Sequence, residues 1–110
     1  MGRYVLMVMT NPAKAAGEDA YNKFYNQIHI PEVFKLFGIK QARRFKHYSS
    51  PLTGPVKFEQ KYLAIYEVET DNIDAAINGM LARAAEMTPS SDAIGPDVHM
   101  EFYEQIAEFK

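Results

Sequence analysis

The residues of this chain best suited to acid–base chemistry lie around the stretch His29-Ile30-Pro31. A histidine side chain has a reference pKa of about 6.5, so His29 can take a proton from a substrate carbon or hydroxyl near neutral pH and return it. Tyr25 lies one helical turn before His29, and Tyr66 lies in a later apolar segment. A tyrosine hydroxyl near the reacting group would donate a hydrogen bond to a developing oxyanion. This set predicts proton transfer that requires neither a cofactor nor a metal ion.

Two neighbouring arginines, Arg43 and Arg44, add a candidate for substrate binding. Adjacent residues of a strand point to opposite faces, so only one of the two can reach a cleft on a given side of a sheet. That arginine would hold a carboxylate or an enolate oxygen in bidentate fashion. The alternative is a surface charge on a strand, paired with a neighbouring glutamate.

The same aromatic and imidazole side chains also have purely structural interpretations. On a helical wheel His29 falls at the border of the apolar stripe, next to Tyr25, where solvent or a backbone carbonyl would satisfy it. The other interpretation is that it points into a cleft between a helix and a sheet. Tyr62 and Tyr66 share one face of their segment, so they are candidates for the core or for an interface as well as for a site.

Several classes of site find no support in the sequence. His29, His47 and His99 lie on different predicted elements, without the i, i+4 spacing of a zinc helix, so no metal site is expected. The chain contains no cysteine and no dinucleotide, P-loop or serine-hydrolase motif.

Length and charge narrow the class of protein. The chain has 110 residues and a formal net charge of −2, which predicts one domain over residues 1–110 without a general attraction to nucleic acid or membranes. Its first nine residues are too short an apolar run for a signal sequence or a membrane span, and with no cysteine a cytoplasmic location is expected. An RNA-binding module is a remote alternative, because Tyr62 and Tyr66 could stack on bases beside a basic run.

The periodicity predicts six elements. Apolar and alternating patterns predict strands over residues 3–10, 39–49, 61–69 and 98–109, and helical spacing predicts helices over residues 18–37 and from Asp71 to near Thr88. Pro31 is expected to interrupt the first helix near Ile30 and to begin a new turn, which Gly38 ends. The order βαββαβ is that of an α+β, ferredoxin-like fold, in which an antiparallel four-stranded sheet carries both helices on one face.

The second face of this sheet needs a cover. In the segment over residues 61–69, Leu63 and Ile65 are apolar on the side opposite Tyr62 and Tyr66, and the first strand is apolar on both sides. The second helix has an apolar stripe of mostly small residues, which predicts close packing on the other face. Two helices cover only one side, so we predict a homodimer whose sheets face each other and close a dimeric α+β barrel.

The stretch NKFYNQIHIPEVFKLFGIKQARRF, with its His-x-Pro step, Gly38 and basic strand, resembles the helix-to-strand signature of EthD-like proteins in the dimeric α+β-barrel superfamily. The pattern covers roughly residues 3–48, and the element order extends the resemblance over the chain. It implies a homodimer with a small-molecule cleft between sheet and helices in each subunit. Related families include cofactor-free monooxygenases, polyketide cyclases, lactone isomerases and haem-degrading enzymes. This sequence lacks the histidine in the second helix that is part of the polyketide-cyclase pattern.

Two functions of different classes follow. The first is a cofactor-independent enzyme, such as an isomerase or monooxygenase, that acts on a small aromatic or enolisable compound. In it His29 is the catalytic acid/base, and Tyr25, Arg43, Arg44 and Tyr66 are candidates for substrate binding. The second is a non-catalytic protein that binds the same kind of ligand. The sequence does not separate the two.

Overall fold

The structure of the chain is a computed structural model that describes residues 2–55 and 57–110. Its elements, in chain order, are the strand β1 (Gly2–Thr10), the helix α1 (Gly17–Phe24), the π-helical segment η1 (Tyr25–His29), the helix α2 (Ile30–Phe37), the strands β2 (Gln41–Lys46) and β3 (Tyr62–Thr70), the helix α3 (Ile73–Arg83), the 3₁₀ turn η2 (Ala84–Glu86) and the strand β4 (His99–Glu104).

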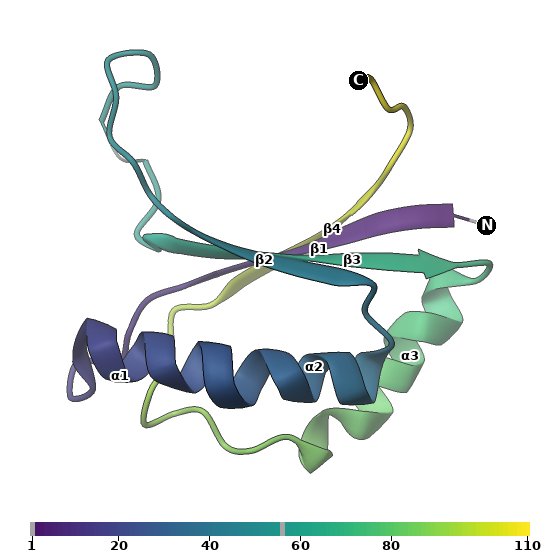
Figure 1. Cartoon of the computed structure of the whole chain (residues 1–110), viewed down its shortest axis with the longest axis horizontal. Helices are drawn as coiled ribbons and strands as arrows, with labels where there is room; N and C mark the ends of the chain where they lie inside the picture. The colour runs from purple at the N-terminus through teal and green to yellow at the C-terminus, as the bar shows by residue number, and fades with distance from the viewer. Residues whose placement is uncertain (1, 56) are drawn as a thin grey trace.

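The four strands form one antiparallel sheet in the order β2-β3-β1-β4. Leu6 at the centre of β1 lies opposite Tyr66 of β3 on one side and opposite Phe102 of β4 on the other. The rod formed by α1, η1 and α2 and the helix α3 both lie on one face of this sheet (Figure 1). The fold is therefore α+β with the βαββαβ order of the ferredoxin-like fold, as the sequence predicts.

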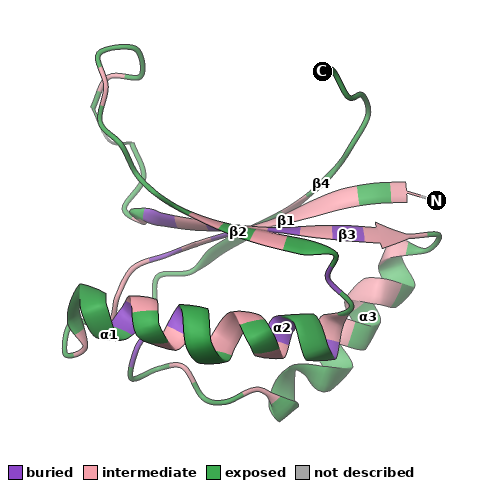
Figure 2. Cartoon of the chain, in the orientation of Figure 1, coloured by how far each residue is buried: buried purple, intermediate pink, exposed green. Residues whose placement is uncertain are grey.

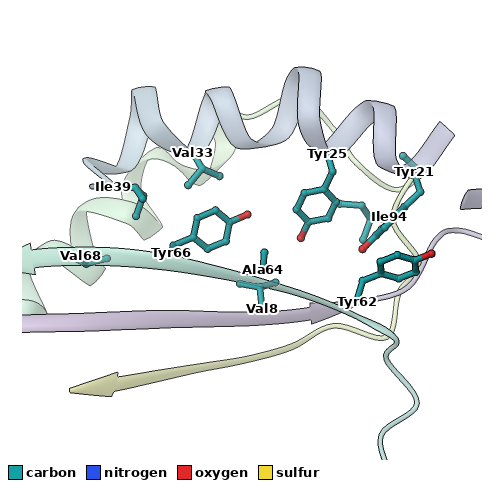
Figure 3. Close-up of a cluster of buried hydrophobic side chains, with 11 residues drawn as sticks. Val8, Tyr21, Tyr25, Val33, Ile39, Tyr62, Ala64, Tyr66, Val68 and Ile94 are labelled. Carbon is teal, nitrogen blue, oxygen red and sulfur yellow. The ribbon is translucent and has the colours of Figure 1, made fainter. Parts of the chain in front are cut away.

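The core lies between β3, β1 and the first helix. The alternation of β3 buries Tyr62, Ala64, Tyr66 and Val68 on the helix side, whereas Leu63, Ile65 and Glu67 on the other side are only half-buried. Tyr21 is completely buried, and its hydroxyl shares a hydrogen bond of 2.5 Å with Oγ1 of Thr10. Figure 3 shows the rings of Tyr21, Tyr25, Tyr62 and Tyr66 between the helix and the sheet. Tyrosines thus form much of this core, and their hydroxyls need partners inside it.

The α-helical pattern is interrupted directly before Ile30, as predicted, but by a π-helical turn and not by an end of the helix. Residues 17–37 run as one continuous helical rod (Figure 1), in which the π-helical turn Tyr25–His29 comes directly before α2. The amide of Ile30 donates to the carbonyl of Tyr25, five residues back. A wider turn gives the proline ring room beside the carbonyl that it would otherwise strike, so the chain accommodates Pro31 by widening the helix. Gly38 ends α2 in the left-handed conformation, with φ of 65°, as predicted.

The second helix differs from its prediction in two respects. Its N-cap is Asn72, one residue after the predicted Asp71. The side chain of Asn72 accepts a hydrogen bond of 3.0 Å from the amide of Ala75. The expected close packing on the sheet is not met, because none of the residues of α3 is buried. Ile73 and Met80 are partly buried against the core. The apolar stripe of α3 therefore faces the sheet without filling the space between them.

We call the side of the sheet away from the helices the open face. Val5, Met7, Met9, Leu63 and Ile65 lie there and are half-buried (Figure 2). The described part of the β2–β3 loop and the C-terminal tail, residues 105–110, both extend to this side (Figure 1). In the tail, Ile106 and Phe109 are 95% and 91% exposed. The open face is thus apolar at its centre and flanked by segments with exposed apolar side chains.

No helix in the described ranges is long and apolar enough to cross a membrane.

Candidate functional site

A cavity of about 530 Å³ lies between the sheet and the helices α2 and α3. Its walls come from β1, β3, β4, α2, α3 and the segment after α3. Its lining residues are Leu6, Val8, His29, Val33, Phe37, Tyr66, Ile77, Met80, Leu81, Ala84, Met87, Met100, Glu101 and Phe102. The volume suits a small organic molecule, and the walls are mostly aliphatic, aromatic and thioether groups.

His29 lines this cavity at the end of the π-helical turn. Its ring packs edge-on against Tyr25, with 4.9 Å between ring centroids. Its Nδ1 atom is buried and has no hydrogen-bond partner among the described residues. The structure therefore places His29 in the cavity wall, as the second of its two interpretations expects.

Burial sets the charge of His29. Burial lowers the pKa of the imidazole below its ordinary value; the Glu32 carboxylate opposes this shift, and the Arg44 cation adds to it. The ring is therefore neutral at pH 7, and a neutral imidazole nitrogen can accept a proton from a bound molecule.

Tyr66 also lines the cavity, from the centre of β3. Its hydroxyl points toward Tyr25 in Figure 3, but it makes no hydrogen bond within the described part of the chain. Burial, followed by the electrostatic effect of Tyr25, raises the pKa of Tyr66 far above its ordinary value. Burial likewise raises the pKa of Tyr25. Both phenols therefore stay protonated.

Arg44 is the arginine that faces the helices. Its guanidinium donates hydrogen bonds to the side-chain oxygens of Asn22 (2.9 Å) and Asn26 (2.8 Å), and it lies 4.4 Å from the centre of the Tyr25 ring. Arg43 points to the open face, where its guanidinium lies 3.7 Å from the carboxylate of Glu67. Neither arginine belongs to the cavity wall. The structure thus brings His29, Tyr25 and Tyr66 together, places Arg44 behind Tyr25, and separates Arg43 from all of them.

The sequence did not single out most of the wall. Ile77, Met80, Ala84 and Met87 read as the packing stripe of a helix, and Met100 and Phe102 as one face of a strand. Nothing in an apolar pattern says whether the side chains meet their neighbours or leave a space. The alternation of β4 places Met100 and Phe102 on one face, and the register with β1 shows that this is the helix side.

A contact that was not evident from the sequence joins α2 to the segment after α3. The carboxylate of Glu32 accepts hydrogen bonds from the backbone amide (3.0 Å) and the hydroxyl (2.7 Å) of Thr88. These bonds lower the pKa of Glu32 below its ordinary value. Arg83 adds a hydrogen bond of 3.3 Å to the carbonyl of Leu36. The C-terminal end of α3 and the segment after it are therefore fastened to α2.

A second depression, of about 470 Å³, lies at the start of α1. Lys14, Lys46, Lys61 and Glu18 line it, and Glu18 accepts hydrogen bonds from Lys46 (3.0 Å) and from the hydroxyl of Tyr62. It includes none of the predicted site residues. Tyr62 and Tyr66 are buried on the helix side, so their rings are not available to stack on bases. No group of three metal-ligating side chains occurs in residues 2–55 and 57–110.

Solved structures match nearly the whole chain. An EthD-like protein from Ralstonia eutropha matches with a TM-score of 0.69 and 15% sequence identity, covering 99% of this chain and 96% of its own. An ethyl tert-butyl ether D (EthD) family protein from Bacillus halodurans matches with a TM-score of 0.50 and 15% identity, covering 96% and 100%. A Dabb family protein with a ferredoxin-like fold from Mesorhizobium loti matches with a TM-score of 0.56 and 12% identity, covering 97% and 100%.

No protein-family model and no curated protein sequence matches the chain. The resemblance predicted from the His-x-Pro stretch is confirmed at the level of structure: over nearly its full length this chain matches EthD-like and Dabb family proteins and has a ferredoxin-like fold.

Proposed function

We propose that this chain is an EthD-like, cofactor-independent enzyme that acts on a small aromatic or enolisable compound in the cavity between the sheet and the helices. The observation that supports this most is the neutral imidazole of His29 in the wall of a mostly apolar cavity. An apolar cavity binds the carbon skeleton of a substrate, and a neutral imidazole inside it has a nitrogen lone pair that can accept a proton at neutral pH.

In the proposed reaction His29 accepts a proton from a carbon or hydroxyl of the substrate and returns it to the same molecule at another position. The bond to hydrogen that breaks leaves its electron pair on the substrate, which becomes an enolate, and the second transfer restores a neutral product. This isomerisation balances without an oxidant. Oxygenation of the same enolate would require dioxygen as a second substrate. Tyr66 stays protonated and would stabilise the enolate if its hydroxyl turned toward the cavity.

The decisive experiment compares wild type with His29→Ala for binding and turnover of phenolic and lactone compounds. We expect the variant to retain binding within a few-fold and to lose turnover by a factor of about 100 or more, the range of general acid–base catalysis. His47→Ala is the matched control, because His47 is exposed and lies outside the cavity. Unchanged turnover in His29→Ala would remove His29 from the reaction. Binding by wild type without turnover of any compound would favour the non-catalytic binding protein.

We also propose that the chain forms a homodimer through its open faces. The apolar residues there are half-exposed, and ion pairs such as Arg3–Glu69 (3.3 Å) and Arg43–Glu67 (3.7 Å) accompany them. The exposed Ile106 and Phe109 lie in a tail that extends to this side (Figure 1). A second copy related by a two-fold axis would cover the apolar centre and meet both flanking segments.

A further inference from the structure

The charge of the cavity wall restricts what the cavity can bind. Among the residues that line it, only His29, Tyr66 and Glu101 have side chains that ionise. Burial keeps His29 neutral at pH 7 and Tyr66 protonated. Glu101 lies between Met100 and Phe102 in β4, so its side chain points to the open face, where its carboxylate lies 3.6 Å from Nε2 of His99. No charged side chain of the described residues therefore points into the cavity.

Two arginines of the surrounding elements, Arg44 and Arg83, are engaged elsewhere. Arg44 is held by Asn22 and Asn26 against the ring of Tyr25, and it does not belong to the wall. Arg83 is bonded to the carbonyl of Leu36 and to the carboxylate of Glu86, at 3.1 Å. A carboxylate that entered the cavity would lose its hydration and find no positive partner, which is strongly unfavourable.

The apolar part of the wall favours flat, polarisable ligands. Met80, Met87 and Met100 come from three different segments and place thioether groups around the cavity, and Phe37 and Phe102 add aromatic rings. Thioethers make favourable contacts with aromatic rings and adapt to ligands of different outline.

We propose that the cavity selects uncharged aromatic compounds and rejects aromatic carboxylates of the same shape. This inference rests on the proposed function and names the substrate class of that site. It departs from the expectation that an arginine holds a carboxylate in the cleft.

Two probes of almost equal shape test the charge selectivity, namely 2-acetylnaphthalene and 2-naphthoate. Titration calorimetry of the full-length protein at pH 7.5 should show tighter binding of the ketone by a factor of about 10 or more, because burying an unpaired carboxylate is costly. Equal or tighter binding of 2-naphthoate would overturn the inference and leave the proposed function standing. Failure of both probes to bind to folded protein would overturn both, because it would deny that the cavity accepts aromatic ligands.

A charge introduced into the wall provides the complementary test. Met80→Lys places a cation in the cavity and should shift the ratio of the two affinities toward 2-naphthoate by a factor of about 10. Met80→Leu is the matched control and should preserve the wild-type ratio, because it keeps the wall neutral. An unchanged ratio in folded Met80→Lys would show that the probes bind elsewhere and would overturn the inference. Should Met80→Lys fail to fold, the wild-type ratio decides alone.

Discussion

His29 combines a neutral ring with a position in the wall of the cavity, and its burial couples its charge to the stability of the fold. Unfolding restores its ordinary pKa of about 6.5, so below that pH the unfolded chain binds a proton more readily than the folded one. The contribution of His29 to stability is unchanged at higher pH and falls as the pH decreases from about 6.5 through the lowered pKa of the folded state.

This effect predicts a pH-dependent difference between two variants. Between pH 7.5 and 5, urea unfolding should show a larger loss of stability for wild type than for His29→Gln, which has no proton to bind. Glu32 and Arg44, the charged groups that act on the ring, remain present in both proteins. His47→Gln should behave like wild type. Parallel stability curves for wild type and His29→Gln would contradict the burial of the imidazole.

The hydroxyls of Tyr66 and Tyr21 provide a second prediction at the same scale. The hydroxyl of Tyr66 makes no hydrogen bond in the described structure. Tyr66→Phe should therefore lower the free energy of unfolding by less than about 0.5 kcal/mol, or raise it. Tyr21→Phe removes the partner of the buried Thr10 and should cost about 1–3 kcal/mol. Urea unfolding of the two variants measures the difference, and the reverse order would contradict these assignments.

At the scale of elements, the strands followed from the sequence more directly than the helices. The alternation of polar and apolar residues in β3 predicts which of them are buried, because the side chains of a strand point in only two directions. The same rule says that Arg43 and Arg44 diverge, but not which one faces the helices. In the structure it is Arg44, which lies opposite the buried Ala64 of β3 and bonds to Asn22 and Asn26. The direction of Arg44 depends on both the strand and the helix, so the sequence of neither segment alone predicts it.

The helices show where a pattern is insufficient. The π-helical turn before Pro31 is a change of hydrogen-bond partner by one residue, which leaves the apolar spacing almost unaltered. The stripe of α3 has the same spacing whether the helix touches the sheet or stands away from it. The cavity, which is the central feature of the candidate site, was therefore not predictable in outline, although His29 and Tyr66 in its wall were named as candidates.

The contact between Glu32 and Thr88 leads to a prediction about the mobility of the segment after α3. Glu32→Ala removes both hydrogen bonds to Thr88, so the amide of Thr88 should exchange its hydrogen about three- to tenfold faster, as expected for one lost hydrogen bond. Hydrogen-exchange NMR measures this rate. Amides of β3 should not change. Glu108→Ala, in the exposed tail, is the control, and unchanged exchange at Thr88 in the Glu32 variant would show that this contact does not hold the segment.

At the scale of the whole molecule, we expect the open face to determine the state of assembly. Wild type should sediment as a dimer at micromolar concentration, because the half-exposed apolar residues of β1 and β3 need a cover. Ile65→Glu places a charge in the centre of that face and should yield a folded monomer. Gln27→Glu adds the same charge on the exposed side of the first helix and should leave the dimer intact. A stable monomer of wild type would contradict the proposed interface.

The cavity and the tyrosine core occupy different parts of the space between the helices and the sheet. The tyrosine core consists of Tyr21, Tyr25 and Tyr62, which pack together beneath the first helix. The cavity is shaped in part by half-exposed or exposed side chains of α3 and η2, namely Ile77, Leu81 and Ala84. Substitutions in the latter group alter the ligand that fits while disturbing few buried contacts. The shape of the cavity can therefore change in this scaffold with little penalty in folding, and proteins of 12–15% identity that share the architecture need not share a reaction.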